Sequence, residues 1–233
     1  MMRSLLALFT PSFVRTKTNV CATPGARLRA LLLPLALAAA VQVHAAPAPA
    51  VPGASPSPLQ TTVLIIRHAD KPAEGRGLSP TGLARARAYV PFFSQLQLDS
   101  QALTPTALYA TADSRGSERA RLTLTPLAQS LHLPLDTRFP AKQIDPLVDA
   151  VRAGPPGRVA LICWHHGEIP ALLRALGADP AQLLPDGRWP GRVFDWMVVL
   201  RLDARGRLIP GSAQRLTIDV LHPAPAGATA VAP

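Results

Sequence analysis

Arginine and histidine residues follow three separate apolar segments of this 233-residue chain. Guanidinium groups bind phosphate oxygens in a forked, bidentate geometry and stay charged at any working pH. An imidazole can act as a nucleophile or carry a proton near neutral pH. Side chains of these types, brought together, are suited to phosphoryl transfer. In chain order they are Arg67, His68, Arg119, His165 and His166.

The three apolar segments predict the strands that must position these side chains. They are TVLII (62–66), TALYA (106–110) and RVALICW (158–164). Apolar runs without polar alternation are typical of strands covered on both faces, as in a parallel α/β sheet. The carboxyl ends of parallel strands share one edge, where ligands bind. Residues 193–218 predict an antiparallel hairpin around Asp203 to Gly206. We therefore expect an α/β fold, a three-layer α/β/α sandwich with a mostly parallel central sheet and an antiparallel edge hairpin.

Helix patterns follow each of the three runs. Ser79-Pro80 predicts a helix start, since serine caps helices and proline suits the first helical position. Pro91 is expected to kink that helix or divide it in two. A second helix is expected from near Ser117, and a third from Gly167 to a stop at Gly177. The expected apolar stripes are Leu83, Ala86, Val90 and Phe93; Ala120, Leu124, Leu127 and Leu131; and Ile169, Leu172, Leu173 and Leu176.

Four ordered motifs resemble those of a known family. They are IIRHADK (65–71), LSPTGLARA (78–86), RARLT (119–123) and ALICWHHGEIPALLRALG (160–177). Over roughly residues 62 to 200 the chain resembles the histidine phosphatase superfamily, also called phosphoglycerate mutase-like. One departure is Ala69, which stands where that family usually has glycine.

The resemblance implies roles for several residues. His68 would attack phosphorus and become a phosphohistidine, which water then hydrolyses. Arg67 and Arg119 would hold the phosphoryl oxygens in the transition state. The second family histidine is assigned to His166, because it directly precedes Gly167, and His165 is the less favoured choice.

Other positions have weaker assignments. Arg115 replaces a serine usual in the family, and is either a third phosphate contact or a solvated loop residue. Gly167 opens a helix whose free backbone N–H groups favour an anion. Asp145 is the first candidate for the general acid and Glu168 the second. Asp70 is expected to have a structural role, paired with Lys71, rather than to orient His68. Cys163 and Trp164 are expected to complete a buried strand, and Trp189 and Trp196 to lie in the core or a pocket wall.

The two ends of the chain are predicted to lie outside the folded domain. Residues 1–45 combine a basic start, the apolar run ALLLPLALAAAV and the small-residue site VHA, which is typical of a cleaved secretory signal peptide. Residues 46–60 predict a Pro/Ala linker, 61–221 the folded domain and 222–233 a disordered tail. We expect export to the periplasm of a Gram-negative type cell, with no stable membrane anchor after cleavage.

Composition argues against several classes of partner. The net charge of +10 falls to +5 once the five basic residues before Ala45 are removed, and neither basic blocks nor many aromatic residues remain to bind nucleic acid. Only Cys163 stays in the mature chain, so no intrachain disulfide is expected. Adjacent histidines in extended backbone point to opposite sides, and neither HExxH nor paired cysteines occur, so no metal is expected. No glycine-rich nucleotide loop is present, so no cofactor is expected.

These features predict a metal-independent phosphoric monoester hydrolase acting on a small phosphorylated substrate. Two alternatives stay open: a phosphomutase, and a catalytically degenerate family member that binds phosphorylated ligands or a partner.

Overall fold

The computed structural model of the chain describes residues 60–222. The predicted signal peptide, almost all of the predicted linker and nearly all of the tail lie outside these residues. Among residues 60–222, no helix has the length and apolar character needed to cross a bilayer.

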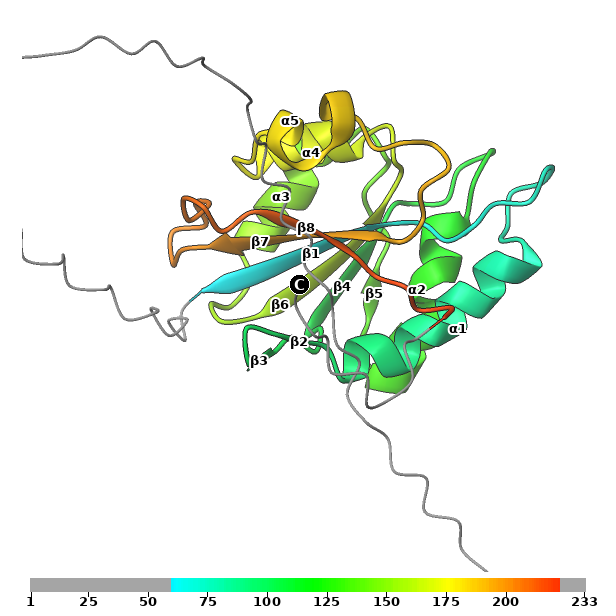
Figure 1. The fold of residues 1–233 in the computed structure, drawn as a ribbon, viewed down its shortest axis with the longest axis horizontal. Helices are drawn as coiled ribbons and strands as arrows, with labels where there is room; N and C mark the ends of the chain where they lie inside the picture. The colour runs from blue at the N-terminus through cyan, green and yellow to red at the C-terminus, as the bar shows by residue number, and fades with distance from the viewer. Residues whose placement is uncertain (1–59, 223–233) are drawn as a thin grey trace, which may run out of the picture. The chain divides into compact units, whose positions relative to one another are not determined.

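A six-stranded sheet forms the centre of the described domain, in the order β5-β4-β6-β1-β7-β8 (Figure 1). The strands β5, β4, β6 and β1 are parallel, whereas β7 is antiparallel to both β1 and β8. The predicted mostly parallel sheet with an antiparallel edge hairpin is therefore confirmed. The strands are β1 (Thr61–Arg67), β4 (Ala107–Ala110), β5 (Leu135–Asp136), β6 (Val159–Trp164), β7 (Trp196–Leu202) and β8 (Gln214–Thr217).

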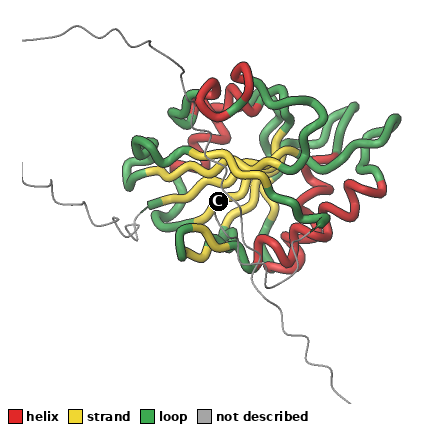
Figure 2. The backbone as a smooth tube through the Cα atoms, viewed as in Figure 1, coloured by secondary structure: helices red, strands yellow, loops and turns green. Residues whose placement is uncertain are grey.

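Helices cover both faces of this sheet (Figures 1 and 2). Side chains of β1 alternate between two cores: Val63 and Ile65 belong to one, Leu64 and Ile66 to the other. Strand β6 is buried along its whole length and alternates in the same way. This two-sided burial explains the continuous apolar runs in the sequence. The first core is covered by α3 (Ile144–Arg152), α4 (Ile169–Ala175) and α5 (Pro180–Leu183), and the second by α1 (Pro80–Ser94) and α2 (Arg119–Leu131). The 3-10 turn η1 (Pro185–Gly187) follows α5 and has no buried residue.

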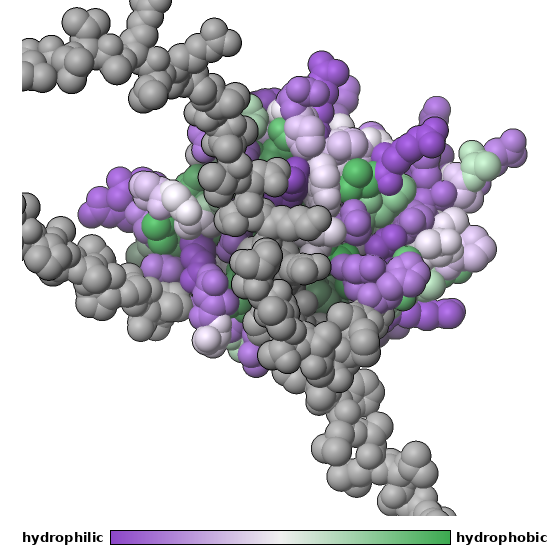
Figure 3. Space-filling model, in the orientation of Figure 1, coloured by the Kyte–Doolittle hydropathy of each residue, from purple (hydrophilic) through white to green (hydrophobic). Residues whose placement is uncertain are grey.

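Helix α1 starts as predicted but presents a different face to the core. Ser79 Oγ accepts a hydrogen bond from the Gly82 N–H, and Pro91 leaves the helix undivided. The predicted stripe is wrong at Leu83, which is 46% exposed, while Arg85 is buried. Arg85 turns inward because it forms an ion pair with Asp70, which places charge on the buried face. Leu83 is also the one large apolar side chain left exposed between residues 60 and 222, and the visible coloured surface in Figure 3 is mainly hydrophilic.

The other predicted elements agree with the structure more closely. Helix α2 begins at Arg119, and α4 ends before Gly177, which has the left-handed φ of +91° that glycine adopts without strain. The hairpin turn lies at Asp203–Gly206, where the Gly206 N–H donates to the Asp203 carbonyl. Helix α3 and the small hairpin of β2 (Gln97–Leu98) and β3 (Gln101–Ala102) had no counterpart in the sequence-based prediction.

The register of the parallel strands decides which residues reach the edge together. Arg67 is paired with Trp164, and Ala110 with Cys163. The residues that follow, His68, Thr111 and His165, therefore leave the sheet at nearly the same level.

Candidate active site

His68 lies at the carboxyl edge of the sheet and is only 4% exposed. Its backbone N–H donates to the Trp164 carbonyl at 3.2 Å. Its Nδ1 is 2.8 Å from the Ala69 carbonyl oxygen, and because a carbonyl can only accept, Nδ1 must carry the proton. The lone pair of the neutral ring is then on Nε2, the atom free to act as a nucleophile.

The turn that carries His68 is fixed by the neighbouring helices. The Ala69 N–H donates to Thr123 Oγ1 at 2.9 Å. On the other side, a Cβ added at Gly82 would lie 2.3 Å from the Asp70 carbonyl oxygen, so only glycine allows α1 to approach this closely. The motifs that contain Thr123 and Gly82 thus hold the backbone on either side of His68.

The surroundings of His68 keep its imidazole neutral. Burial lowers its pKa to about 3, and the positive charges of Arg67 and Arg119 act in the same direction. The hydrogen bond with Ala69 opposes this effect only in part. At pH 7 the His68 imidazole is therefore neutral, and the positively charged Arg67 and Arg119 act on it.

Arg67 is held rigidly beside His68. It is 2% exposed, and its Nη1 donates to the carbonyls of Gly191 at 2.7 Å and Val193 at 3.1 Å. The guanidinium carbon lies 3.9 Å from the centroid of the Phe194 ring. Burial lowers the Arg67 pKa to about 10, so the group stays charged at neutral pH. Its Nε is buried and has no hydrogen-bond partner among the described residues.

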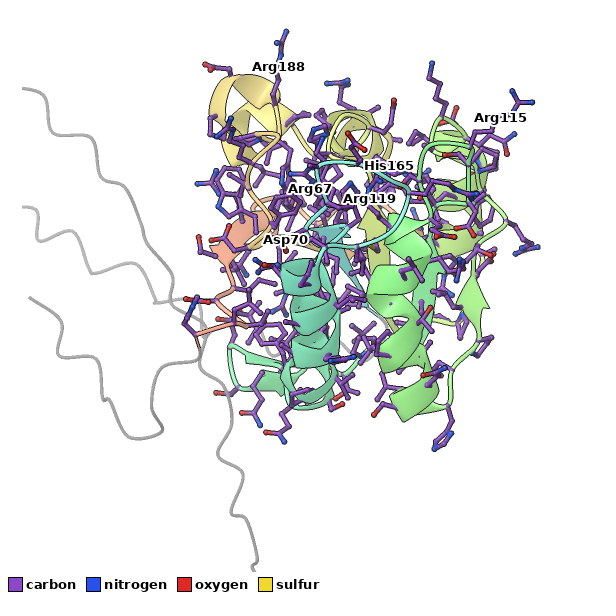
Figure 4. The ribbon with its side chains drawn as sticks, turned by 90° about the vertical axis from the view of Figure 1, so that its right-hand side faces the viewer. Arg67, Asp70, Arg115, Arg119, His165 and Arg188 are labelled. Carbon is purple, nitrogen blue, oxygen red and sulfur yellow. The ribbon has the colours of Figure 1, made fainter. Side chains whose placement is uncertain are left out.

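Arg119, the first residue of α2, resembles Arg67 in its hydrogen bonds. Its Nη1 donates to the carbonyls of Gly75 at 3.2 Å and Arg76 at 3.1 Å, while its Nε is buried without a partner among residues 60–222. Figure 4 shows Arg67, Arg119 and His165 gathered in one region. An unpaired buried N–H is costly, but Arg158 Nε, at the opposite end of β6, has the same feature. The region around His68 is suited to an anion because it combines these N–H groups with the positive charges of Arg67 and Arg119.

Both histidines after β6 line this region, but on different sides. The His165 ring lies edge-on to His68, with centroids 5.3 Å apart, and its Nε2 is 3.3 Å from Thr111 Oγ1. The His166 ring faces Gly191, since a Cβ there would lie 3.3 Å from His166 Nε2. Burial and the arginine charges lower the pKa of both, that of His166 to about 4. The sequence favoured His166 as the second histidine; the structure adds His165 as the direct neighbour of His68, and the assignment of that role stays a prediction.

The remaining predicted site residues lie further out. Asp145 is exposed in the first turn of α3, and Glu168 is partly buried at the start of α4. Neither carboxylate forms a hydrogen bond or ion pair with His68 in the described part of the chain. Arg115 is exposed and points away from the Arg67 region in Figure 4. Gly167 is exposed and lines a shallow pocket of about 700 Å³ that extends toward Arg188.

The structural role predicted for Asp70 holds, with a different partner. Its carboxylate accepts from Arg85 Nε at 2.7 Å, so the expected pairing with Lys71 is corrected to Arg85. Cys163 and Trp164 are fully buried as predicted, and burial raises the pKa of the Cys163 thiol. Trp189 is buried in the core and stacks against Trp196. Residues 60–222 hold no group of three or more His, Cys, Asp or Glu side chains placed to bind a metal ion.

Sequence reasoning missed the segment Gly191–Phe194, which contacts Arg67 through two carbonyls and one ring. It comes more than 120 residues after Arg67 in the chain. No sequence motif marks the segment Gly191–Phe194, although it leads into β7, the first strand of the predicted hairpin.

Acidification is expected to destabilise the fold through His68. Its pKa is about 3 when folded and 6.5 in the reference state, so the unfolded chain binds more protons between these values, and stability falls as pH drops through this window. From pH 7 to pH 5 the loss from this residue alone is about 2 kcal/mol. Urea denaturation at both pH values measures it, and the His68→Asn variant should show a smaller pH dependence. Equal dependence in the two proteins would contradict this account.

Comparison with solved structures finds similar chains at low sequence identity. A protein assigned as the phosphohistidine phosphatase SixA from Nakamurella multipartitia is 19% identical, with 64% of this chain and 94% of that chain covered and a TM-score of 0.41. A phosphoglycerate mutase from Plasmodium falciparum is 17% identical, with coverages of 64% and 87% and a TM-score of 0.41. A mycobacterial glucosyl-3-phosphoglycerate phosphatase in complex with inorganic phosphate is 16% identical, with coverages of 60% and 88% and a TM-score of 0.42.

No protein-family model matches the sequence, and a search of curated proteins finds no match. At such low identities, a reaction has to be inferred from the residues of the site. The resemblance to the histidine phosphatase superfamily rests on the four sequence motifs.

Proposed function

We propose that this protein hydrolyses phosphate monoesters through a covalent phosphohistidine at His68, as a phosphatase of the histidine phosphatase superfamily. The observation that carries the proposal is the neutral His68 imidazole, with its Nε2 lone pair free, beside two arginines whose buried Nε–H groups lack partners within residues 60–222. A phosphoryl group offers the tetrahedral anion that these donors fit.

The proposed reaction has two steps. In the first, His68 Nε2 attacks phosphorus, the bond to the ester oxygen breaks, and that oxygen leaves with a proton from a general acid. In the second, water attacks the phosphohistidine, the P–N bond breaks, and inorganic phosphate and the neutral imidazole form again. Arg67 and Arg119 stabilise the charge on the phosphoryl oxygens in both transition states. The hydrogen bond from Nδ1–H to the Ala69 carbonyl keeps the reactive nitrogen aimed at phosphorus and supports positive charge on the ring.

The experiment that tests this function is a trapping experiment on the wild-type protein. Rapid quenching during turnover of a labelled aryl phosphate, in buffer containing EDTA, should give a phosphoenzyme that is stable to base and labile to acid. Peptide mapping should place the label on His68. A panel of sugar phosphates, nucleotides, phosphohistidine peptides and phospholipid head groups then defines the preferred substrate class. The absence of both turnover and labelled protein across the panel would overturn the proposal.

The proposed general acid gives a test that depends on the leaving group. Glu168→Gln and Asp145→Asn are compared on an alkyl phosphate and on p-nitrophenyl phosphate, whose leaving group needs no proton. Loss of the true acid should lower kcat for the alkyl ester by about 10²-fold or more and change the aryl ester much less, because general acid catalysis contributes about 10²- to 10⁴-fold. A variant that affects both esters equally acts on something other than proton donation.

Binding without turnover is the second candidate function. It is favoured by one observation: among the described residues neither the Asp145 nor the Glu168 carboxylate is held by a hydrogen bond or an ion pair, so neither is fixed in position to protonate a leaving oxygen. Titration calorimetry with inorganic phosphate distinguishes the two. Equal affinity in wild type and His68→Ala, with no turnover in either, is the expected result for a binding protein.

We also propose that the protein is exported and that residues 1–45 are removed. Expression in a Gram-negative host should yield a periplasmic chain beginning at Ala46, because the VHA site precedes it. Cell fractionation and N-terminal sequencing measure this outcome. A full-length chain confined to the cytoplasm would contradict it.

A further inference from the structure

Phe194 lies beside both His68 and Arg67 in the candidate site. The Arg67 guanidinium carbon lies 3.9 Å from its ring centroid, and the His68 ring centroid lies 6.3 Å from it. The first distance is well within the range of a cation–π interaction. Phe194 remains partly exposed, so its ring forms part of the wall of the site rather than of the core.

The backbone around Phe194 is held from several directions. The Val193 carbonyl accepts from both Arg67 Nη1 at 3.1 Å and Trp189 Nε1 at 2.9 Å. The Phe194 carbonyl accepts from the hydroxyl of Tyr89, a fully buried residue of α1, at 3.5 Å. The next carbonyl, that of Asp195, accepts from the Ile218 N–H at 2.6 Å. The ring is therefore a fixed surface.

These contacts restrain the Arg67 guanidinium on two sides. Gly191 and Val193 hold one edge through Nη1, and Phe194 covers one face. The plane of the group is then determined, and so is the direction of its unpartnered Nε–H. Without the ring, the group could tilt about the Nη1 bonds, and water could reach both it and His68.

We propose that Phe194 is a positioning residue for phosphoryl transfer: its ring orients the Arg67 guanidinium toward the phosphoryl group and excludes water from the His68 imidazole. This inference rests on the proposed function. It adds to the site a residue that does not touch the reacting atoms and acts through Arg67.

The test compares Phe194→Leu with Phe194→Tyr on p-nitrophenyl phosphate. Phe194→Leu should lower kcat/KM by about 10-fold, as expected for loss of a partly desolvated cation–π contact. Phe194→Tyr keeps the ring and should stay within about 3-fold of wild type on the same grounds. Because more water would reach His68, its pKa should rise in Phe194→Leu, and the acid limb of the pH profile of kcat/KM should move to higher pH. A purely structural residue would not move that limb.

A double-mutant cycle gives the decisive control. If Phe194 acts through Arg67, adding Phe194→Leu to Arg67→Gln should lower kcat/KM by less than about 2-fold further, since interacting residues are non-additive. Phe92→Leu, which removes a ring from the core of α1, should lower Tm but leave kcat/KM and its acid limb unchanged. The inference would be overturned if the effects of Phe194→Leu and Arg67→Gln on kcat/KM were fully additive, or if Phe194→Leu alone left kcat/KM unchanged.

The failure of this inference can be told apart from failure of the proposed function. If the wild type turns over no phosphate ester, the proposed reaction is wrong, and the orienting role is read from calorimetry with inorganic phosphate instead. Phe194→Leu should then bind phosphate about 10-fold more weakly than wild type and Phe194→Tyr equally well. Equal affinity in all three proteins would overturn the role of Phe194 in orienting Arg67.

Discussion

Replacement of His68 by asparagine should lower kcat on any accepted phosphate ester by at least about 10⁴-fold, the scale of loss seen when a nucleophile is removed. The variant loses the Nε2 lone pair that is proposed to attack phosphorus, while its side-chain amide can still donate to the Ala69 carbonyl as Nδ1–H does. The fold and the two arginines are thus retained, and inorganic phosphate should still bind. Steady-state kinetics, phosphoenzyme trapping and calorimetry on one preparation measure all three properties.

The matched control is His132→Asn. His132 is an exposed histidine at the end of α2 with a left-handed φ of 54°, a conformation that asparagine tolerates well. The His132→Asn variant should keep the kcat and Tm of the wild type. Turnover by His68→Asn within about 10-fold of wild type would exclude His68 as the nucleophile, because loss of a nucleophile lowers kcat by far more than this.

Replacement of Arg67 by glutamine should lower kcat/KM by about 10²- to 10³-fold, the loss found when one preorganised donor to a developing oxyanion is removed. The effect is large because Arg67 is 2% exposed and its orientation is set by two carbonyls, so neither solvent nor another side chain can replace it. Stability should also fall, since the Gly191 carbonyl loses its Arg67 donor and the Val193 carbonyl keeps only the Trp189 Nε1 donor. Kinetics and urea denaturation measure the two effects.

Arg138→Gln is the control for Arg67→Gln. Arg138 is an exposed arginine paired with Asp136 at 2.8 Å, and a surface pair of this kind contributes little. Its loss should leave kcat/KM unchanged. A drop of less than about 5-fold in Arg67→Gln would show that Arg67 supplies no transition-state stabilisation of the expected size.

Local sequence patterns predicted the elements whose signals are strong. The strands β1, β4 and β6 and the start of α1 at Ser79 agree with the structure because apolar runs and a serine–proline cap depend on few neighbours. Helix α3 was not predicted, although Ile144, Leu147, Val148 and Val151 follow helical spacing. Here the signal was present and could have been used.

Other features depend on contacts between distant segments and have no local signal. The inward turn of Arg85 depends on Asp70, fifteen residues earlier, and it rotates the buried face of α1. The contacts of Arg67 with Gly191 and Val193 join residues more than 120 positions apart. The proximity of His165 to His68 follows from the β1–β6 register, which the sequence does not encode in any single motif.

The reversed direction of β7 has a consequence for how such a site could diversify. In a fully parallel sheet, only segments that leave a strand reach the ligand edge, and each must then continue into a helix. Because β7 runs opposite to β1, the chain arrives at that edge just before a strand begins, at Gly191 to Asp195. Insertions or exchanges in this approach would reshape the wall of the pocket without breaking a strand-to-helix crossover. Selection could therefore alter which ligands reach this edge while His68 and its sheet stay unchanged.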